Sequence, residues 1–247
     1  MKVNLFAAKC ITNLHVGNGD VNYSIIDQEV ERDPVTGWPV INASGVKGAV
    51  REFFEARWGK DDIRVKKYFG SGKDDTAQGS YVFLQADILF VPLRVSDGSS
   101  RSYVLATTDE ILRGYSKRVE ALRGIGEKVL EDSQGGTEVE VEGDDKKYTL
   151  RKTCGKWNEY AAQDCILVPN LNVFDLPVIA RNVLDDNGIS KNLWYEEYVP
   201  HESVFSLIIL TPNEMDDEFR KLLTSEPVQF GGNASIGYGL MGIREVR

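Results

Sequence analysis

The stretch that decides the fold is VFSLIILTPNEMDDEFRKLL, residues 204–223. Its first seven residues are almost all apolar, which predicts a strand over 204–210. The pair Thr211-Pro212 follows, and a polar N-cap with a proline in the first turn is the usual start of a helix. Beyond that pair, apolar side chains recur at helical spacing and predict a buried face: Met215, Phe219, Leu222 and Leu223.

Toward the C-terminus, two short strand-like segments follow this helix. They are PVQF (227–230) and LMGIREV (240–246), and a glycine-rich loop joins them. Toward the N-terminus, SYVFLQADILFVPLRV (80–95) is apolar on both faces, which is typical of a central strand. The sequence therefore predicts that the helix near the C-terminus has strands both before and after it along the chain.

The first half repeats this pattern of strand, helix and strand. Residues 2–12 are predicted to form a strand, because Val3, Leu5, Ala7 and Ile11 recur on nearly one face. A loop over 13–43 with a turn at DPVTG (33–37) follows, and Ser44 is then predicted to cap a helix that reaches about Trp58. The buried stripe of that helix is Val46, Ala49, Val50, Phe53 and Phe54.

The resulting order is β-α-β-β-α-β, so we predict an α+β fold with a ferredoxin-like (RRM-like) core. Residues 1–95 and 201–247 would form the core, and 96–200 would be a large central insertion. In its first part, 96–165, we expect an amphipathic helix over 109–130 and an acidic hairpin, EVEVEGDDKKYTL. In its last part, about 170–200, we expect an exposed hairpin, because the turn signal DDNG (185–188) separates two strand-like runs.

The charge distribution matters more than the net charge of −9. Residues 127–145 hold eight acids and one base, which leaves only −2 for the rest of the chain. Residues 32–73 hold nine bases against five acids. Because phosphate contacts need local positive potential, this basic segment permits an RNA site without proving one.

Composition excludes several classes of protein and of site. No apolar run is long enough to span a membrane, and the N-terminal segment lacks the features of a signal peptide. Three cysteines at irregular spacing suit a reducing cytoplasm. A zinc site from Cys154, Cys165 and His201 is conceivable, but no close cysteine pair supports it.

Two glycine motifs do not form nucleotide sites. Only 17 residues follow Phe230, too few for the helix and returning strand that a dinucleotide fold requires after FGGNASIGYGLMG (230–242). FGSGKDD (69–75) ends like a P-loop, but an aspartate follows Lys73 where Ser or Thr is needed.

Two other segments could hold phosphate. In the 231–239 loop, closely spaced glycines let backbone N–H groups approach an anion, although the loop could equally be a tight turn between two strands. In SGVKGAVR (44–51), Lys47 and Arg51 lie one turn apart near a helix N-terminus, which attracts anions. The alternative for this segment is a capped surface helix with an Arg51–Glu55 pair.

For catalysis, Asp27 follows two apolar residues in the first long loop and could be a general base toward a ribose 2′-hydroxyl or a ligand for a divalent ion. The alternative is a turn-forming aspartate. Only His15 and His201 are available as histidines, so a histidine-driven acyl-transfer triad is not expected.

Several of these segments together resemble one family. The run HVGNGDVNYSIIDQEVERDPVTGWPVINASGVKGAVR (15–51) resembles the N-terminal signature of RAMP-superfamily CRISPR proteins, in which a His-x-Gly-x-Gly loop precedes an acid, a Pro-Val-Ile strand and a Ser-x-x-Lys-Gly-x-x-Arg helix. GGNASIGYG (231–239) matches the glycine-rich loop of that superfamily. With three further segments the chain is similar to the repeated backbone subunits of the Cmr, or type III-B, interference complex: SIID (24–27), LPVIARN (176–182) and LWYEEYVP (193–200).

The resemblance implies a filament of copies along a CRISPR RNA, with other Cmr subunits and a single-stranded target RNA as partners. The exposed hairpin would be a thumb that wedges between guide and target bases at regular intervals, through Leu193, Trp194 and Tyr195. The residues that the resemblance assigns to RNA binding are Arg32, Ser44, Lys47, Arg51, Arg181, Asn182, Gly231, Gly232, Asn233, Gly237 and Gly239.

The resemblance also implies a catalyst. In the family, an aspartate at the position of Asp27 cleaves target RNA with a divalent metal, magnesium or manganese. His15 matches the histidine of the family loop, where we expect it to organise the loop. Some relatives carry an acid where Ala234 stands here, so this chain departs from the pattern that would give a second acidic catalyst.

Two other functions remain open. One is a scaffold that holds guide RNA while another subunit cuts. The other is a RAMP nuclease that processes CRISPR precursor RNA without metal, although the scarcity of histidine weighs against it. The guide sequence itself need not be recognised by the protein, because base pairing carries that information.

Overall fold

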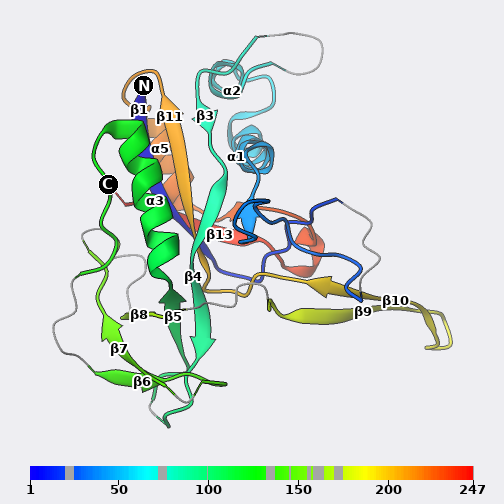
Figure 1. The fold of residues 1–247 in the computed structure, drawn as a ribbon. Coiled ribbons are helices and arrows are strands. Elements are labelled where there is room, and N and C mark those ends of the chain that lie inside the picture. Colours follow the sequence, from blue (N-terminus) through cyan, green and yellow to red (C-terminus); the bar gives the residue numbers. More distant parts are fainter. Residues whose placement is uncertain are drawn as a thin grey trace.

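The computed structural model describes residues 1–19, 25–71, 77–98, 100–131, 137–144, 146–154, 157, 164–169 and 175–246. Ser24, Lys73, Asp132, Asp145 and the start of the predicted thumb at 170–174 lie outside them. The described part is a mixed α+β structure around one large sheet, with a separate two-stranded hairpin that projects from it (Figure 1).

The helices are α1 (Ala43–Trp58), α2 (Ile63–Phe69), α3 (Asp109–Arg123) and α5 (Asp217–Ser225), with a 3-10 helix at Ala234–Ile236. The strands of the large sheet are β1 (Lys2–Cys10), β2 (Val40–Ile41), β3 (Val82–Phe83), β4 (Ala86–Arg94), β5 (Tyr103–Thr107), β6 (Glu138–Glu140), β7 (Lys147–Arg151), β8 (Cys165–Leu167), β11 (Val204–Thr211), β12 (Val228–Gln229) and β13 (Leu240–Glu245). The separate hairpin consists of β9 (Val178–Leu184) and β10 (Ser190–Glu197).

The centre of the large sheet has the order β13-β1-β11-β4, and all neighbouring pairs in it are antiparallel. The register of β1 and β11 runs from Lys2 opposite Thr211 to Lys9 opposite Val204. The first strand of the chain is thus central, between two strands that come from the last 45 or so residues. The N- and C-terminal parts of the chain therefore fold as one unit.

Both faces of this centre are covered. Successive residues of β1 point to opposite faces, so Phe6 packs in one core cluster and Leu5 in another. The first cluster lies under α1, α2 and α5, and its middle is an aromatic group in which the rings of Phe54 and Phe219 stack 4.2 Å apart. The second cluster lies under α3 on the opposite face.

Strands of the insertion extend the sheet beyond β4. The strand β5 pairs antiparallel with β4, β8 lies parallel to β5, and β7 and β6 follow outward. The hairpin of β6 and β7 confirms the acidic hairpin predicted over 138–150. The proposed division at 95 and 200 stays a prediction.

The exposed hairpin is also confirmed. In it, β9 and β10 pair antiparallel from Val178 opposite Glu197 to the turn, and they project beyond the edge of the molecule (Figure 1). The DDNG turn forms as expected, because Asp185 Oδ1 accepts hydrogen bonds from the backbone N–H groups of Asn187 and Ile189.

Both predicted helix starts were wrong by a few residues. The N-cap position of α1 is Asn42, whose side chain makes no capping bond, and Ser44 lies in the first turn. The helix after β11 begins at Asp217 instead of at Thr211-Pro212. Thr211 still pairs with Lys2 in the sheet, and the Asp216 side chain accepts two backbone N–H bonds, so the stronger cap lies five residues later.

Three predicted boundaries also shift. Strand β1 ends at Cys10 instead of at residue 12. Ile11, which was predicted to share the apolar face of the strand, therefore lies beyond it and is 49% exposed. The predicted strand over 80–95 is interrupted at residues 84–85 and forms two strands, β3 and β4, although the N–H of Leu84 between them still bonds to Ile208 of β11. Helix α3 ends at Arg123 because Gly124 adopts the left-handed conformation at φ 79°, which stops the helix seven residues before the predicted end.

Among the described residues, no helix is both long and apolar enough to cross a membrane.

The aromatic group under α1 and α5 gives a stability test. We expect Phe219→Ala to lower the free energy of unfolding by about 3–5 kcal/mol, because it removes a fully buried ring and leaves a cavity. Val35→Ala removes a side chain that is 90% exposed, so we expect a change within about 0.5 kcal/mol. Urea unfolding followed by circular dichroism measures both, and equal losses would contradict the assignment of this core.

Candidate functional site

Asp27 is attached through its backbone to the base of the projecting hairpin. The N–H groups of Asp27 and Gln28 both donate to the carbonyl of Tyr195, each at 3.1 Å. In return, Oδ2 of Asp27 accepts the N–H of Tyr195 at 2.8 Å. The side chain is exposed. One carboxylate oxygen is therefore held by β10, and Oδ1 accepts no hydrogen bond from the residues that the structure describes, which leaves it available to a substrate.

His15 lies close behind this segment and is buried. Its Nδ1 is 2.7 Å from the carbonyl oxygen of Glu197, so Nδ1 carries the proton because a carbonyl can only accept. The backbone carbonyl of His15 accepts the N–H of Gly232 at 2.9 Å. These bonds join β10 to the glycine loop and support the organising role expected for His15.

Two adjacent buried carboxylates hold the site together, and the sequence analysis did not select them. Glu196 and Glu197 are 2% and 3% exposed. Glu197 forms an ion pair with Arg32 at 2.5 Å, and its other oxygen accepts the N–H of Val30 at 3.0 Å. Because an unpaired buried charge is very costly, these partners offset the cost of burying the Glu197 carboxylate.

Glu196 has partners on two other segments. The amide of Asn233 in the glycine loop donates to one carboxylate oxygen, and Nε of Arg181 lies 3.4 Å from the other. The guanidinium of Arg181 also lies over the ring of Tyr238, 4.8 Å from its centroid. The two carboxylates thus tie the Asp27 segment, the hairpin and the glycine loop together. The signal in the sequence was a pair of acids inside an otherwise largely apolar strand, LWYEEYVP.

Four arginines of the basic segment 32–73 are occupied within the chain. Arg32 is paired with Glu197, and Arg51 pairs with Glu55 at 2.6 Å, the alternative that the sequence had left open. The two others, Arg57 and Arg64, bond to Glu226 and Glu218, respectively, which lie far along the chain. The positive potential of this segment is therefore lower than its sequence composition indicates.

The N-terminal turn of α1 keeps features that suit an anion. It contains no acidic residue, and the N-cap side chain makes no bond to its N–H groups. Ser44 is exposed and Lys47 is half-buried on this turn. Helix α1 packs against β12, and β12 leads directly into the glycine loop, so the helix and the loop belong to the same region of the fold.

At two positions of the glycine loop, the packing of the protein itself requires glycine, whether or not the loop binds RNA. Gly231 has φ 68°, and a Cβ there would lie 2.2 Å from the carbonyl oxygen of His15. Gly239 has φ 81°, and a Cβ there would lie 2.0 Å from the oxygen of Phe230. Around Gly237 there is open space instead. The loop is thus a tight turn packed on the chain at His15, and its contact with phosphate stays a prediction.

The thumb side chains alternate along β10. Leu193 and Tyr195 are 52% and 39% exposed on one face of the hairpin, where they are free to contact a partner. Trp194 points to the other face, opposite Arg181, and its Nε1 is buried with no hydrogen-bond partner in the described part of the chain. Asn182 is exposed, and its Oδ1 accepts the hydroxyl of Ser190 across the hairpin.

The described residues contain no group of three or more His, Cys, Asp or Glu side chains that could hold a metal. The zinc site considered for Cys154, Cys165 and His201 is therefore not formed. Cys165 is buried in β8, and burial raises the pKa of its thiol to about 12. Asp27 can supply one oxygen to a magnesium or manganese ion, which fits these ions only if RNA phosphates and water complete the shell. Ala234 lies in the 3-10 helix of the glycine loop and supplies no acid there.

A family model covers almost the whole chain. The family model described as the RAMP superfamily matches residues 7–242. The CRISPR system Cmr endoribonuclease Cmr4 of Pyrococcus furiosus is 25% identical, over 98% of this chain and 95% of its own length.

Solved structures show the same fold. A chain in the cryo-EM structure of the type III-B Cmr-beta complex bound to cognate target RNA superposes with a TM-score of 0.77 at 22% identity, over 100% of this chain and 98% of that one. A chain in the crystal structure of oligomeric Cmr4 from Pyrococcus furiosus superposes with a TM-score of 0.64 at 21% identity, over 100% and 99% of the two chains. The insertion that the sequence resemblance left unplaced is included in these matches.

The packing of the glycine loop can be tested with two matched substitutions. Gly231→Ala and Gly237→Ala both place a side chain in the left-handed region, which costs about 1–2 kcal/mol. Only Gly231→Ala also forces a Cβ against the His15 carbonyl, so we expect it to lower the free energy of unfolding by clearly more. Urea unfolding compares the two, and hydrogen exchange at the Gly232 amide should rise in Gly231→Ala alone. Equal effects would contradict the packing described.

Proposed function

This chain belongs to the RAMP superfamily, and from that membership we propose that it is the repeated backbone subunit of a type III-B CRISPR (Cmr) ribonucleoprotein, which binds CRISPR RNA and cleaves complementary target RNA at regular intervals. The observation that carries the proposal is the fixed, exposed carboxylate of Asp27 at the base of the projecting hairpin. The name of the Pyrococcus relative, an endoribonuclease that matches nearly the whole chain, supports it.

We propose that the core is ferredoxin-like. In that arrangement the strands of a β-α-β-β-α-β chain lie in the order fourth, first, third, second. With β1, β4, β11 and β13 taken as these four strands, the observed order β13-β1-β11-β4 is the same. Helices α1 and α5 then cover one face, as both helices of such a core should.

We propose that guide RNA follows the surface formed by the α1 N-terminus and the glycine loop. Free N–H groups of a helix start and a half-buried Lys47 suit a phosphate, and a glycine-rich loop lets a ribose-phosphate chain approach its backbone. The partners would be CRISPR RNA, single-stranded target RNA, further copies of this chain and other Cmr subunits, all in the cytoplasm.

The proposed cleavage starts from one carboxylate oxygen. The hairpin, through Leu193 and Tyr195, would displace a target nucleotide so that its 2′-hydroxyl lines up with the adjacent phosphorus. Oδ1 of Asp27 would draw the proton from that hydroxyl while the 2′-oxygen bonds to phosphorus and the bond to the 5′-oxygen breaks, and water would protonate the 5′-oxygen. The backbone N–H of Tyr195 on Oδ2 would keep the carboxylate oriented throughout.

We also propose a divalent ion in this step. Magnesium or manganese, held by Asp27 together with phosphate oxygens of the RNA and water, would offset the charge that builds up on the phosphate.

The role of Asp27 can be tested with Asp27→Asn in the assembled complex. Asparagine keeps an oxygen that can accept the Tyr195 N–H, so the loop should stay in place while the charge is lost. We expect target cleavage to fall by about 10²-fold or more, with target binding unchanged. Cleavage on labelled target RNA and binding by gel shift measure the two. Asp186→Asn removes a charge from the exposed hairpin turn and should leave both unchanged. Full cleavage by Asp27→Asn would remove Asp27 from the mechanism.

A second candidate function is a scaffold that holds guide RNA while another subunit cuts. It is favoured by two observations: the described residues form no group of three or more side chains that could hold a metal, and one oxygen of Asp27 is already bonded to the Tyr195 N–H. The two functions differ in their response to metal removal. We expect EDTA to abolish cleavage by the wild-type assembly and added magnesium or manganese to restore it, while the Asp27→Asn assembly stays inactive in both conditions. Metal-dependent cleavage that is the same in both assemblies would instead favour the scaffold.

A further inference from the structure

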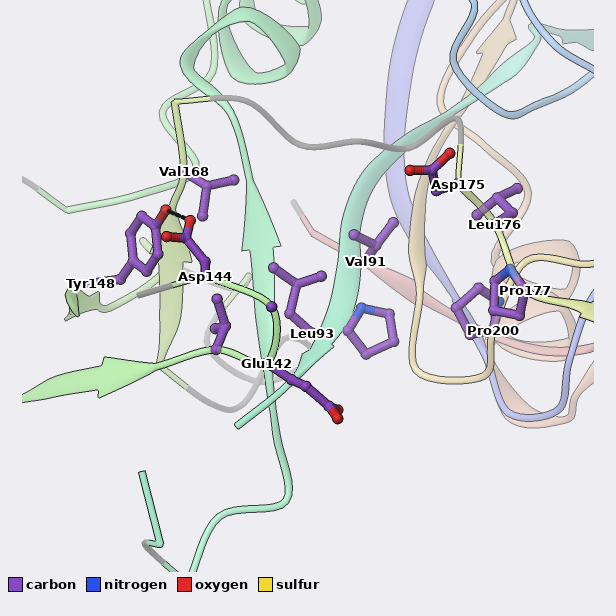
Figure 2. A pocket seen from close by; sticks show the side chains of 13 residues that line it. Val91, Leu93, Glu142, Asp144, Tyr148, Val168, Asp175, Leu176, Pro177 and Pro200 are labelled. Carbon is purple, nitrogen blue, oxygen red and sulfur yellow. Dashed lines mark hydrogen bonds between the residues drawn. The ribbon is translucent and has the colours of Figure 1, made fainter. Parts of the chain in front are cut away.

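A pocket of about 340 Å³ lies where the acidic hairpin β6–β7 approaches the base of the projecting hairpin (Figure 2). Its floor is apolar and includes Val91 and Leu93 of β4, with Leu176 on the side of the projecting hairpin. Among the described lining residues none is Lys, Arg or His, and three are carboxylates: Glu142, Asp144 and Asp175. The pocket therefore suits an apolar side chain that is accompanied by positive charge.

The carboxylates are placed around this floor from two sides. In Figure 2, Asp144 and Glu142 lie on the side of the acidic hairpin, and Asp175 lies beside Leu176 across the pocket. The hydroxyl of Tyr148 donates to Asp144 at 2.5 Å and lowers the pKa of that carboxyl. Glu142 and Asp175 are exposed. Glu142 has a pairing with Arg94 at 3.3 Å, but both side chains are more than half exposed, so this pair is weak.

The matching feature on the same chain is the exposed face of α2 together with the residues just before it. Ile63 is 79% exposed, the kind of apolar residue that a free subunit leaves uncovered. Lys66 and Lys67 follow it at three and four residues, so they share its face of the helix, and Lys60 precedes it by three residues. All three lysines are exposed. This helix thus presents one apolar side chain among three lysines, with the exposed Asp61 beside Lys60 and with Asp62 neutralised by Arg64 at 2.7 Å.

The two features lie at opposite ends of the molecule. Helix α2 is at the end of the sheet where β3 begins, and the hairpin β6–β7 is at the other end, beyond β5 and β8 (Figure 1). A chain cannot bring its own Ile63 to its own pocket, but a second copy can. A contact between opposite ends of identical subunits is heterologous, and when it does not close into a ring it builds a helical filament.

We propose that Ile63 of one copy inserts into the pocket between β4, the acidic hairpin and the hairpin base of the next copy. Lys60, Lys66 and Lys67 would then face Glu142, Asp144 and Asp175 of that copy. The guide-RNA surface proposed above does not include the acidic insertion. This interface would give the insertion the function of receiving the neighbouring subunit. The inference rests on the proposed function only in that it assigns surfaces to the self-association expected there.

The test uses the full chain with guide RNA and measures assembly by analytical ultracentrifugation. Ile63→Asp should weaken self-association by about tenfold or more, because an apolar side chain no longer fills the pocket. Two further chains each reverse the charge of one side: Lys66→Glu with Lys67→Glu, and Glu142→Lys with Asp175→Lys. Each alone should remain largely unassembled, because like charges would meet at every contact.

Mixing these two charge-reversed chains is the decisive step. In the mixture every contact between unlike chains again pairs opposite charges, so assembly should return with alternating subunits. A chain with Lys117→Glu, on the exposed face of α3, is the matched control and should assemble like the wild type. Circular dichroism of each chain checks that the variants fold.

The outcomes separate this interface from the proposed function. Rescue on mixing supports the interface whether or not the assembly cleaves RNA. Wild-type assembly by Ile63→Asp and by both charge-reversed chains would overturn it. Loss of guide-RNA binding by Lys66→Glu with Lys67→Glu at unchanged self-association would also overturn it, since that result would assign the lysines to RNA.

Discussion

The arrangement of the site depends on two neighbouring carboxylates that are buried at the end of β10. Glu196 and Glu197 are taken out of water, so each must find positive or hydrogen-bonding partners inside the protein. They find them on segments far apart in the sequence: Arg32 and Val30 near the N-terminus, Arg181 on the facing strand, and Asn233 near the C-terminus. Because each partner is held by a buried charge, the Asp27 segment, the hairpin and the glycine loop share one relative position.

The sheet makes this convergence possible. With β1 between β11 and β13, the residues that follow β1 and those around β13 leave the sheet at the same place. The N–H of Gly239 bonds to the carbonyl of Asn13, and the N–H of Gly232 to that of His15, so the glycine loop lies directly on the first loop of the chain. The insertion extends the same sheet on its other side and leaves this junction open.

The sequence predicted the elements better than their ends. Apolar periodicity located the strands and helices of the core, and the DDNG signal located the projecting hairpin, because these depend on local spacing. The start of α5 was missed because a Thr-Pro pair competes with Asp216, and only the pairing of Thr211 with Lys2 decides between them. The site was predicted only in part, because sequence motifs are also local. Motifs selected Asp27 and His15, but the role of Glu196 and Glu197 depends on partners up to 167 residues away, which no local pattern contains.

The backbone pairing between residues 27–28 and β10 has a mechanical consequence. A side chain on a separate loop could drift relative to the hairpin, whereas here the carboxylate and the hairpin are hydrogen-bonded through main-chain atoms and must shift together. If successive copies line an RNA, the distance from one carboxylate to the next is then fixed by the repeat of the protein, whatever the nucleotide sequence between them. The repeat of the subunits would then set the spacing between successive cleavage positions.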